Sequence, residues 1–191
     1  MLAVILWRLL IVACALTGFI AAVQLSGFAN AIPGLSQQAS LLTALVYLGL
    51  AAYPLCTGGR EPRNPWPRGA TTVLLLLVAA VYAGLMGGDY DQLWSVFEHI
   101  VTPLVVLLDW ILVGRNQGNC AWWQPLSWVV FPLAYLVYFL IADPGLYGSF
   151  LDPDSSAFPT TVGGFLLAVL VVGYLLYVTA RVRTVFVRSY R

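Results

Sequence analysis

Six apolar stretches, each about the length of a membrane-spanning helix, recur along the chain. A helix crosses about 30 Å of hydrocarbon in roughly 20 residues, and the stretches cover residues 3–26, 36–55, 70–87, 93–113, 122–142 and 161–180. The segments between them are rich in Gly, Pro, Asn and Asp, which favour turns. Only 9% of the residues are charged, against about 25% in soluble domains. The sequence therefore predicts an all-α polytopic membrane helix bundle with six spans, forming a single transmembrane domain over residues 1–191.

The placement of arginine predicts the orientation of the bundle. Every basic residue is an arginine, and cytoplasmic loops of membrane proteins are enriched in Lys and Arg. Apart from Arg8, which we expect to reach the near interface from the first span, the arginines fall in alternate loops or after the last span: Arg60, Arg63, Arg68, Arg115, Arg181, Arg183, Arg188 and Arg191. The other three loops hold no arginine, and their charged residues are Asp89, Asp91, Asp143, Asp152 and Asp154. This alternation predicts that both termini are cytoplasmic.

The supply of metal-binding and redox residues is small. The chain has one histidine, His99, and three cysteines, which are too dispersed for a disulfide framework. Two-histidine zinc motifs and bis-histidine haem sites cannot be built from one histidine. Only a site of carboxylates around His99 would remain for a metal. We therefore expect no metal, no cofactor and no nucleic-acid partner.

Polar residues line one side of the predicted fourth span. They are Asp91, Ser95, Glu98, His99, Thr102 and Asp109. Their spacing of three, four or seven residues places most of them on a shared face of a helix. An ionisable group in hydrocarbon costs at least about 2.5 kcal/mol. This face should therefore contact protein or a water-filled cavity, and it is the first place to look for function.

Helix geometry separates the roles of these polar residues. The side chain of Glu98 should point about 100° away from that of His99, so Glu98 is a poor candidate for orienting the imidazole, whereas Ser95 and Thr102 are better placed. Asp109 lies about 15 Å further along the helix, near the cytoplasmic end, where it would anchor the span or serve as a relay group. Pro103 cannot donate to the carbonyl of His99, so we expect the helix to bend there.

A second group of polar side chains occurs near the outer start of the second predicted span. Ser36, Ser40 and Thr43 share one helix face, and Ser36 lies close to a helix N-terminus, which favours negative charge. One interpretation is structural, with Ser36 and Gln37 capping the helix while Ser40 and Thr43 pack on a neighbour. The other is functional, because the topology places the Ser36 hydroxyl and the His99 imidazole at similar depth in the membrane.

Four segments resemble motifs of a bacterial six-helix membrane family of unknown function. Residues 35–42, Leu-Ser-Gln-Gln-Ala-Ser-Leu-Leu, resemble its Phe-Thr-x-Gln-Ser-Asn-Leu-Leu motif. Residues 98–103, Glu-His-Ile-Val-Thr-Pro, with Asp109-Trp110 after them, resemble its His-x-x-x-Pro and Asp-Trp motifs. Residues 132–138 and 147–152 resemble its later motifs, and the similarity extends over residues 30–175. The chain departs from the first motif at Ser36, Ala39 and Ser40, where the family has Thr, Ser and Asn.

The resemblance implies an activity and a location. The bacterial family is similar to the androgen-induced proteins, which are intramembrane hydrolases of fatty acid esters with a Thr nucleophile and a His. Carried over to this chain, Ser36 would be the nucleophile and His99 would take its proton. Backbone amides with Gln37, Gln38 or Ser40 would hold the oxyanion. A membrane lipid or fatty-acid ester would be the substrate, in the bacterial cytoplasmic membrane.

Two other functions fit the sequence. One is a small proton-coupled transporter with Glu98, His99 and Asp109 as relay groups, although the chain shows no internal repeat of the kind that many transporters have. The other is a non-enzymatic membrane partner protein that binds through its outer loop, residues 147–160.

Overall fold

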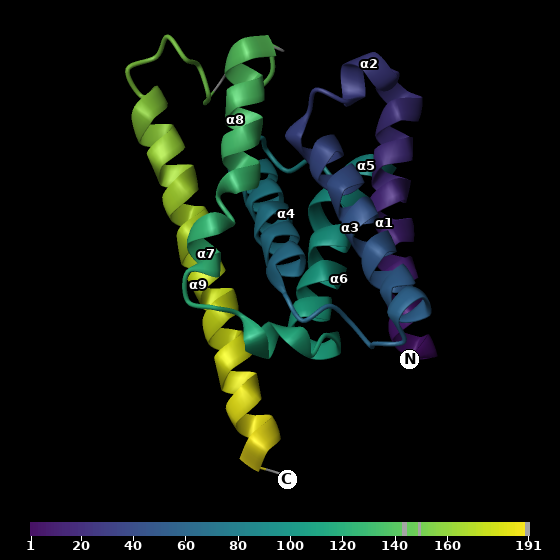
Figure 1. Ribbon diagram of the computed structural model, residues 1–191. Helices are drawn as coiled ribbons and strands as arrows, with labels where there is room; N and C mark the ends of the chain where they lie inside the picture. Colours follow the sequence, from purple (N-terminus) through teal and green to yellow (C-terminus); the bar gives the residue numbers. More distant parts are fainter. Residues whose placement is uncertain (143–144, 149, 190–191) are drawn as a thin grey trace.

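The protein is a bundle of helices in the computed structural model, which describes residues 1–142, 145–148 and 150–189, with side chains described up to residue 184 (Figure 1). Six helices in these ranges are long and apolar enough to cross a membrane: Leu2–Ser26, Leu35–Thr57, Trp66–Leu85, Leu93–Val113, Gln124–Ala142 and Phe158–Thr184. The first three are α1, α3 and α4, and the last belongs to α9 (Phe158–Ser189). No strand occurs in the described ranges. The predicted all-α class is confirmed for the described residues, and each of the six predicted spans corresponds to a helix long and apolar enough to cross a membrane.

The fourth and fifth spans are interrupted where prolines remove backbone donors. The fourth consists of α5 (Leu93–Val96), a π-helix η1 (Phe97–Val101), α6 (Thr102–Leu108) and a π-helix η2 (Asp109–Val113). The π-helix η1 ends next to Pro103, which lacks an N–H group, and such segments are frequent at functional sites. The fifth span divides into α7 (Gln124–Ser127) and α8 (Val130–Ala142), because Pro132 cannot donate to the carbonyl of Trp128. Two short helices, α2 (Phe28–Ala31) and η3 (Asn116–Asn119), lie in the connections.

Helix α4 is the centre of the bundle. It packs against α3, α6 and α9, and 61% of its most apolar stretch is buried. On one side of it α1 lies along α3, and on the other side stand α8 and α9 (Figure 1). Only 22% of the most apolar stretch is buried in the fifth span, and only 17% in α9. Helices α8 and α9 therefore present most of their apolar surface outward.

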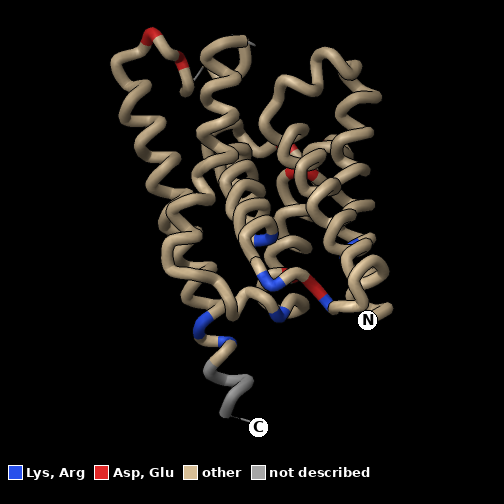
Figure 2. Tube along the Cα trace, in the orientation of Figure 1, with Lys and Arg blue, Asp and Glu red and all other residues tan. Residues whose placement is uncertain are grey.

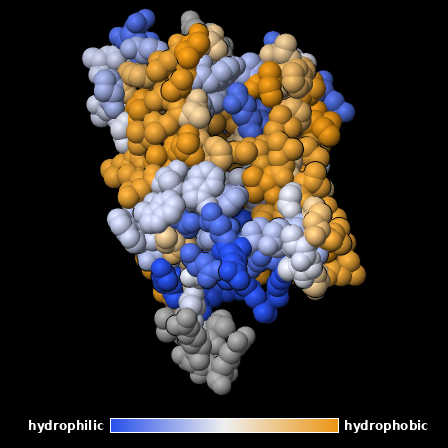
Figure 3. Space-filling view, viewed as in Figure 1, coloured by the Kyte–Doolittle hydropathy of each residue, from blue (hydrophilic) through white to orange (hydrophobic). Residues whose placement is uncertain are grey.

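The surface has the distribution of side chains that a bilayer requires. A broad apolar band crosses the visible face, and hydrophilic residues gather at the end that holds the chain termini (Figure 3). Exposed residues in the spans include Leu45, Ile141 and Leu167, which are 68%, 80% and 62% exposed. The basic residues collect toward the same end as both termini (Figure 2). Asp143 and Arg191, which the sequence pattern places among the loop charges, lie outside the described residues, as does the side chain of Arg188.

Two arginines are buried inside this end of the bundle. The sequence placed Arg68 in a loop, but it lies in α4 and is fully buried. Its Nε donates to Asp109 Oδ2 and its Nη2 to the carbonyl of Asp109, both at 2.8 Å. Asp109 also accepts from Tyr47 Oη at 3.1 Å and is fully buried, so it is no surface anchor. Arg8 is likewise buried and bonds Glu61 at 2.7 Å instead of reaching lipid.

Gly69 allows α4 to approach Trp128 closely. A Cβ atom at Gly69 would lie 2.1 Å from Trp128 Cζ2, whereas one at Gly84 of the same helix would meet nothing within 4 Å. We expect Gly69→Ala to lower stability by about 1–3 kcal/mol, because the fully buried indole cannot give way. The SDS concentration at the midpoint of unfolding should be lower in Gly69→Ala than in the wild type, and it should be unchanged in Gly84→Ala. Equal midpoints would show that the bundle can absorb the added methyl group.

Candidate functional site

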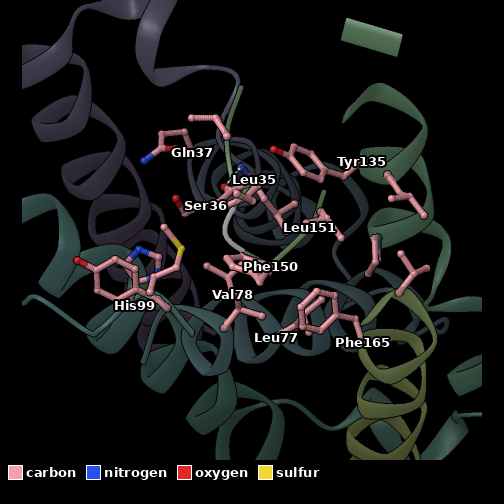
Figure 4. Close-up of a pocket in the computed structure, with 18 of the residues that line it drawn as sticks. Leu35, Ser36, Gln37, Leu77, Val78, His99, Tyr135, Phe150, Leu151 and Phe165 are labelled. Atoms are coloured by element: carbon pink, nitrogen blue, oxygen red, sulfur yellow. Dashed lines mark hydrogen bonds between the residues drawn. The ribbon is translucent and has the colours of Figure 1, made fainter. Parts of the chain in front are cut away.

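Ser36 and His99 line one cavity of about 230 Å³, built by α3, α4, the fourth span, α8, the outer loop and α9. Figure 4 shows Ser36, Gln37 and His99 on one side of it, and Tyr135 and Phe165 on the other. Most of the lining side chains are apolar or aromatic: Leu35, Leu77, Val78, Val81, Tyr82, Met86, Trp94, Pro132, Tyr135, Leu136, Leu146, Tyr147, Phe150, Leu151, Val162, Phe165 and Leu166. The cavity therefore has an apolar body with hydroxyl, amide and imidazole groups at one end.

The His99 ring is held by aromatic side chains. It stacks on Tyr82 of α4 with ring centroids 3.7 Å apart and an interplanar angle of 1°. Trp94 approaches it edge-on at 5.9 Å. The stacking fixes the plane of the imidazole, and both of its nitrogens are buried without a hydrogen-bond partner in the described part of the chain.

Ser36 is the second residue of α3, and it does not cap the helix. The N-cap residue is Gly34, which has no side-chain cap hydrogen bond, so the predicted capping by Ser36 and Gln37 is wrong. The Leu35 N–H instead donates to Tyr147 Oη at 3.1 Å. The backbone is thus held on one side of Ser36 by Tyr147, and on the other side by a hydrogen bond from Gln37 to Glu98.

Glu98 lies behind Ser36 and is almost completely buried, with 1% exposed. Gln37 Nε2 donates to Glu98 Oε2 at 2.7 Å, and Ser36 and Ser40 lie near the same carboxylate. The Oε1 atom has no hydrogen-bond partner among the described residues. Gly18 of α1 makes room for this side chain, since a Cβ there would lie 2.6 Å from Glu98 Cγ.

The other polar residues singled out from the sequence lie away from the cavity lining. Gln38 Nε2 donates to the carbonyl of Ile32 at 3.1 Å, and Ser95 Oγ to the carbonyl of Gln92 at 2.9 Å. Thr102 is fully buried without a partner in the described ranges. Asp109 belongs to the Arg68 network described above. Glu98, His99 and Asp109 therefore do not form one cluster.

Two tyrosines that the sequence pattern did not single out hold the start of α3. Tyr135 Oη donates to the carbonyl of Pro33 at 2.9 Å, and Tyr147 accepts from Leu35. Tyr147 has a φ of 64°, a region that costs a non-glycine residue about 1–3 kcal/mol. Its ring packs near Tyr135, Phe139 and Phe150, and burial raises the pKa of its hydroxyl. Tyr147 stays protonated and fixes the loop to α3.

All four segments that carry the family resemblance reach this cavity. They contribute Ser36, His99, Tyr135 and Phe150, which are far apart in the sequence and come from three spans and the outer loop. Comparison with known protein families, curated proteins and solved structures found no match. Within residues 1–142, 145–148 and 150–189, no group of three or more His, Cys, Asp or Glu side chains is placed to hold a metal ion.

Proposed function

We propose that the protein is an intramembrane hydrolase of lipid esters, with Ser36 as the nucleophile and His99 facing the reacting ester. The observation that carries this proposal is that both side chains line one apolar cavity. An ester with an acyl chain has matching chemistry, since its chain would lie along the apolar walls while its carbonyl meets the polar end. The convergence of the four resembling segments on this cavity supports the same activity.

The arrangement of charge supports a location for the reaction. We infer that the arginine-rich end faces the cytoplasm, following the positive-inside rule, in a bacterial cytoplasmic membrane as the resemblance implies. The cavity lies toward the opposite end, because Ser36 is in the first turn of α3 and the cavity is also lined by Leu146, Tyr147, Phe150 and Leu151, which follow α8. Substrate would then enter from the outer leaflet.

A fluorophosphonate probe tests for the nucleophile directly. We expect the purified protein in lipid nanodiscs to be labelled at Ser36, as located by mass spectrometry of the labelled peptide. Ser36→Ala should abolish labelling. Ser26→Ala is the control for the loss of a serine hydroxyl, because Ser26 Oγ donates to the carbonyl of Ala22 at 2.9 Å in α1 and does not line the cavity, and it should be labelled like the wild type. Labelling that persists in Ser36→Ala, or no labelling of folded wild-type protein, would contradict the proposal.

A further inference from the structure

The ionisable group beside the Ser36 hydroxyl is the Glu98 carboxylate. Gln37, the residue after Ser36, donates to Glu98 Oε2 at 2.7 Å and holds the carboxylate near the Ser36 hydroxyl, whereas no hydrogen bond joins Ser36 to His99. His99 is instead stacked on Tyr82, a residue of the neighbouring helix α4. A general base must lie within hydrogen-bond reach of the proton that it takes. By this criterion Glu98 is better placed than His99 to activate Ser36.

The surroundings of Glu98 suit this role. Gln37 occupies Oε2, so that Oε1 is the atom left to accept a proton. Neither of the two salt bridges in the described part of the chain involves Glu98, so no fixed cation competes for its charge. The close approach of Gly18 to Glu98 Cγ limits the movement of the side chain. The carboxylate is thus held in place with one oxygen free.

We propose that Glu98 is the general base of the site, an inference that rests on the proposed ester hydrolysis. The Ser36 proton passes to Glu98 Oε1 as Ser36 Oγ bonds to the acyl carbon. The carbon–oxygen bond to the alcohol then breaks, and the alcohol oxygen takes the proton from Glu98. A water molecule repeats the sequence, giving its proton to Glu98 while its oxygen bonds to the acyl carbon. The fatty acid leaves, and the proton returns to Ser36 Oγ.

This assignment gives His99 a different role from the one expected from the sequence. A ring N–H group of His99 would donate to the ester oxygen that becomes negative in the tetrahedral intermediate. The stack on Tyr82 fixes the plane of the ring before the substrate arrives. Glu98 and His99 would then act on the substrate from different sides, one through Ser36 and the other directly.

Two glutamine variants separate the two roles, because glutamine can donate a hydrogen bond but cannot act as a base near neutral pH. The rate of fluorophosphonate labelling at Ser36 would be compared in Glu98→Gln and His99→Gln. We expect Glu98→Gln to slow labelling by at least about 100-fold, and His99→Gln, which retains a donor, by less than about tenfold. Ser26→Ala should stay close to the wild-type rate, since Ser26 Oγ donates to the carbonyl of Ala22 at 2.9 Å and lies outside the cavity lining.

A pH profile of His99→Gln tests the proposal even if Glu98→Gln fails to fold. Its labelling rate should rise with pH, because the Glu98 carboxyl must lose its proton before it can accept that of Ser36. Tyr147, the other ionisable side chain close to Glu98, stays protonated over this range because burial raises its pKa. A flat profile overturns the assignment, as does normal labelling of folded Glu98→Gln. Labelling lost only in His99→Gln assigns the base to His99 and leaves hydrolysis intact, whereas unlabelled wild-type protein would defeat both proposals.

Discussion

Ser36→Ala is expected to lower the turnover of a long-chain fatty-acid ester by at least about 10³-fold, because removal of a nucleophile eliminates the covalent route. His99→Ala should lower it by about 10²–10³-fold, the usual effect of losing one donor to the oxyanion. The measurement is the release of fatty acid from an ester incorporated in liposomes that contain the purified protein. Ser36 and His99 line the same cavity, so both effects should appear mainly in kcat.

The double variant Ser36→Ala/His99→Ala provides the internal check. Residues that act as a unit are strongly non-additive, whereas a donor to the oxyanion still aids the hydrolysis that remains after the nucleophile is lost. The double variant should therefore be slower than Ser36→Ala alone. A double variant no slower than Ser36→Ala would mean that His99 acts only through Ser36, as its base. Full turnover in either single variant, with the protein still folded, would refute hydrolysis at this cavity.

Arg68→Met is expected to destabilise the bundle more than Gly69→Ala does, lowering stability by about 3–5 kcal/mol. It leaves the Asp109 carboxylate in the interior without its cation, and both side chains are fully buried. Replacing the ion pair as a whole should cost less, because apolar residues of similar volume need no partner. We therefore expect Arg68→Met/Asp109→Leu to recover much of the loss. Unfolding by SDS, followed by tryptophan fluorescence, measures each step.

Arg63→Met is the control for the loss of a positive charge at this end of the bundle. Arg63 is exposed, and an exposed charge contributes about 0–1 kcal/mol. A loss of stability in Arg63→Met as large as that in Arg68→Met would show that net charge matters, rather than the buried pair. A double variant less stable than Arg68→Met would show that Asp109 has other essential partners, of which Tyr47 is the first candidate.

The spans could be predicted because hydrophobicity and turn residues act locally. The sequence also indicated that Ser36 and His99 lie at similar depth, and both reach the cavity. The pairing of Arg68 with Asp109 could not be predicted in this way. The two residues are 41 positions apart, and Arg68 lies at the start of a span, where the sequence pattern looks like the end of a basic loop.

The contact between Glu98 and Gln37 could not be predicted for a different reason. Helix geometry predicted only that the side chain of Glu98 points about 100° away from that of His99 and is a poor candidate for orienting the imidazole. The segment η1 packs against α1, α3 and α4, and both Glu98 and His99 are buried. Two adjacent residues can then serve one site from different sides, His99 beside Tyr82 and Glu98 beside Gln37.

Helices α8 and α9 supply one wall of the cavity, including Leu136 and Leu166, although they are the spans least enclosed by protein. Acyl chains of the surrounding lipid must complete the packing on their outer faces. The width of the cavity consequently depends on lateral pressure and on how ordered the neighbouring lipids are. The bilayer is in this sense a structural component of the site, much as a second subunit completes the site of an obligate dimer.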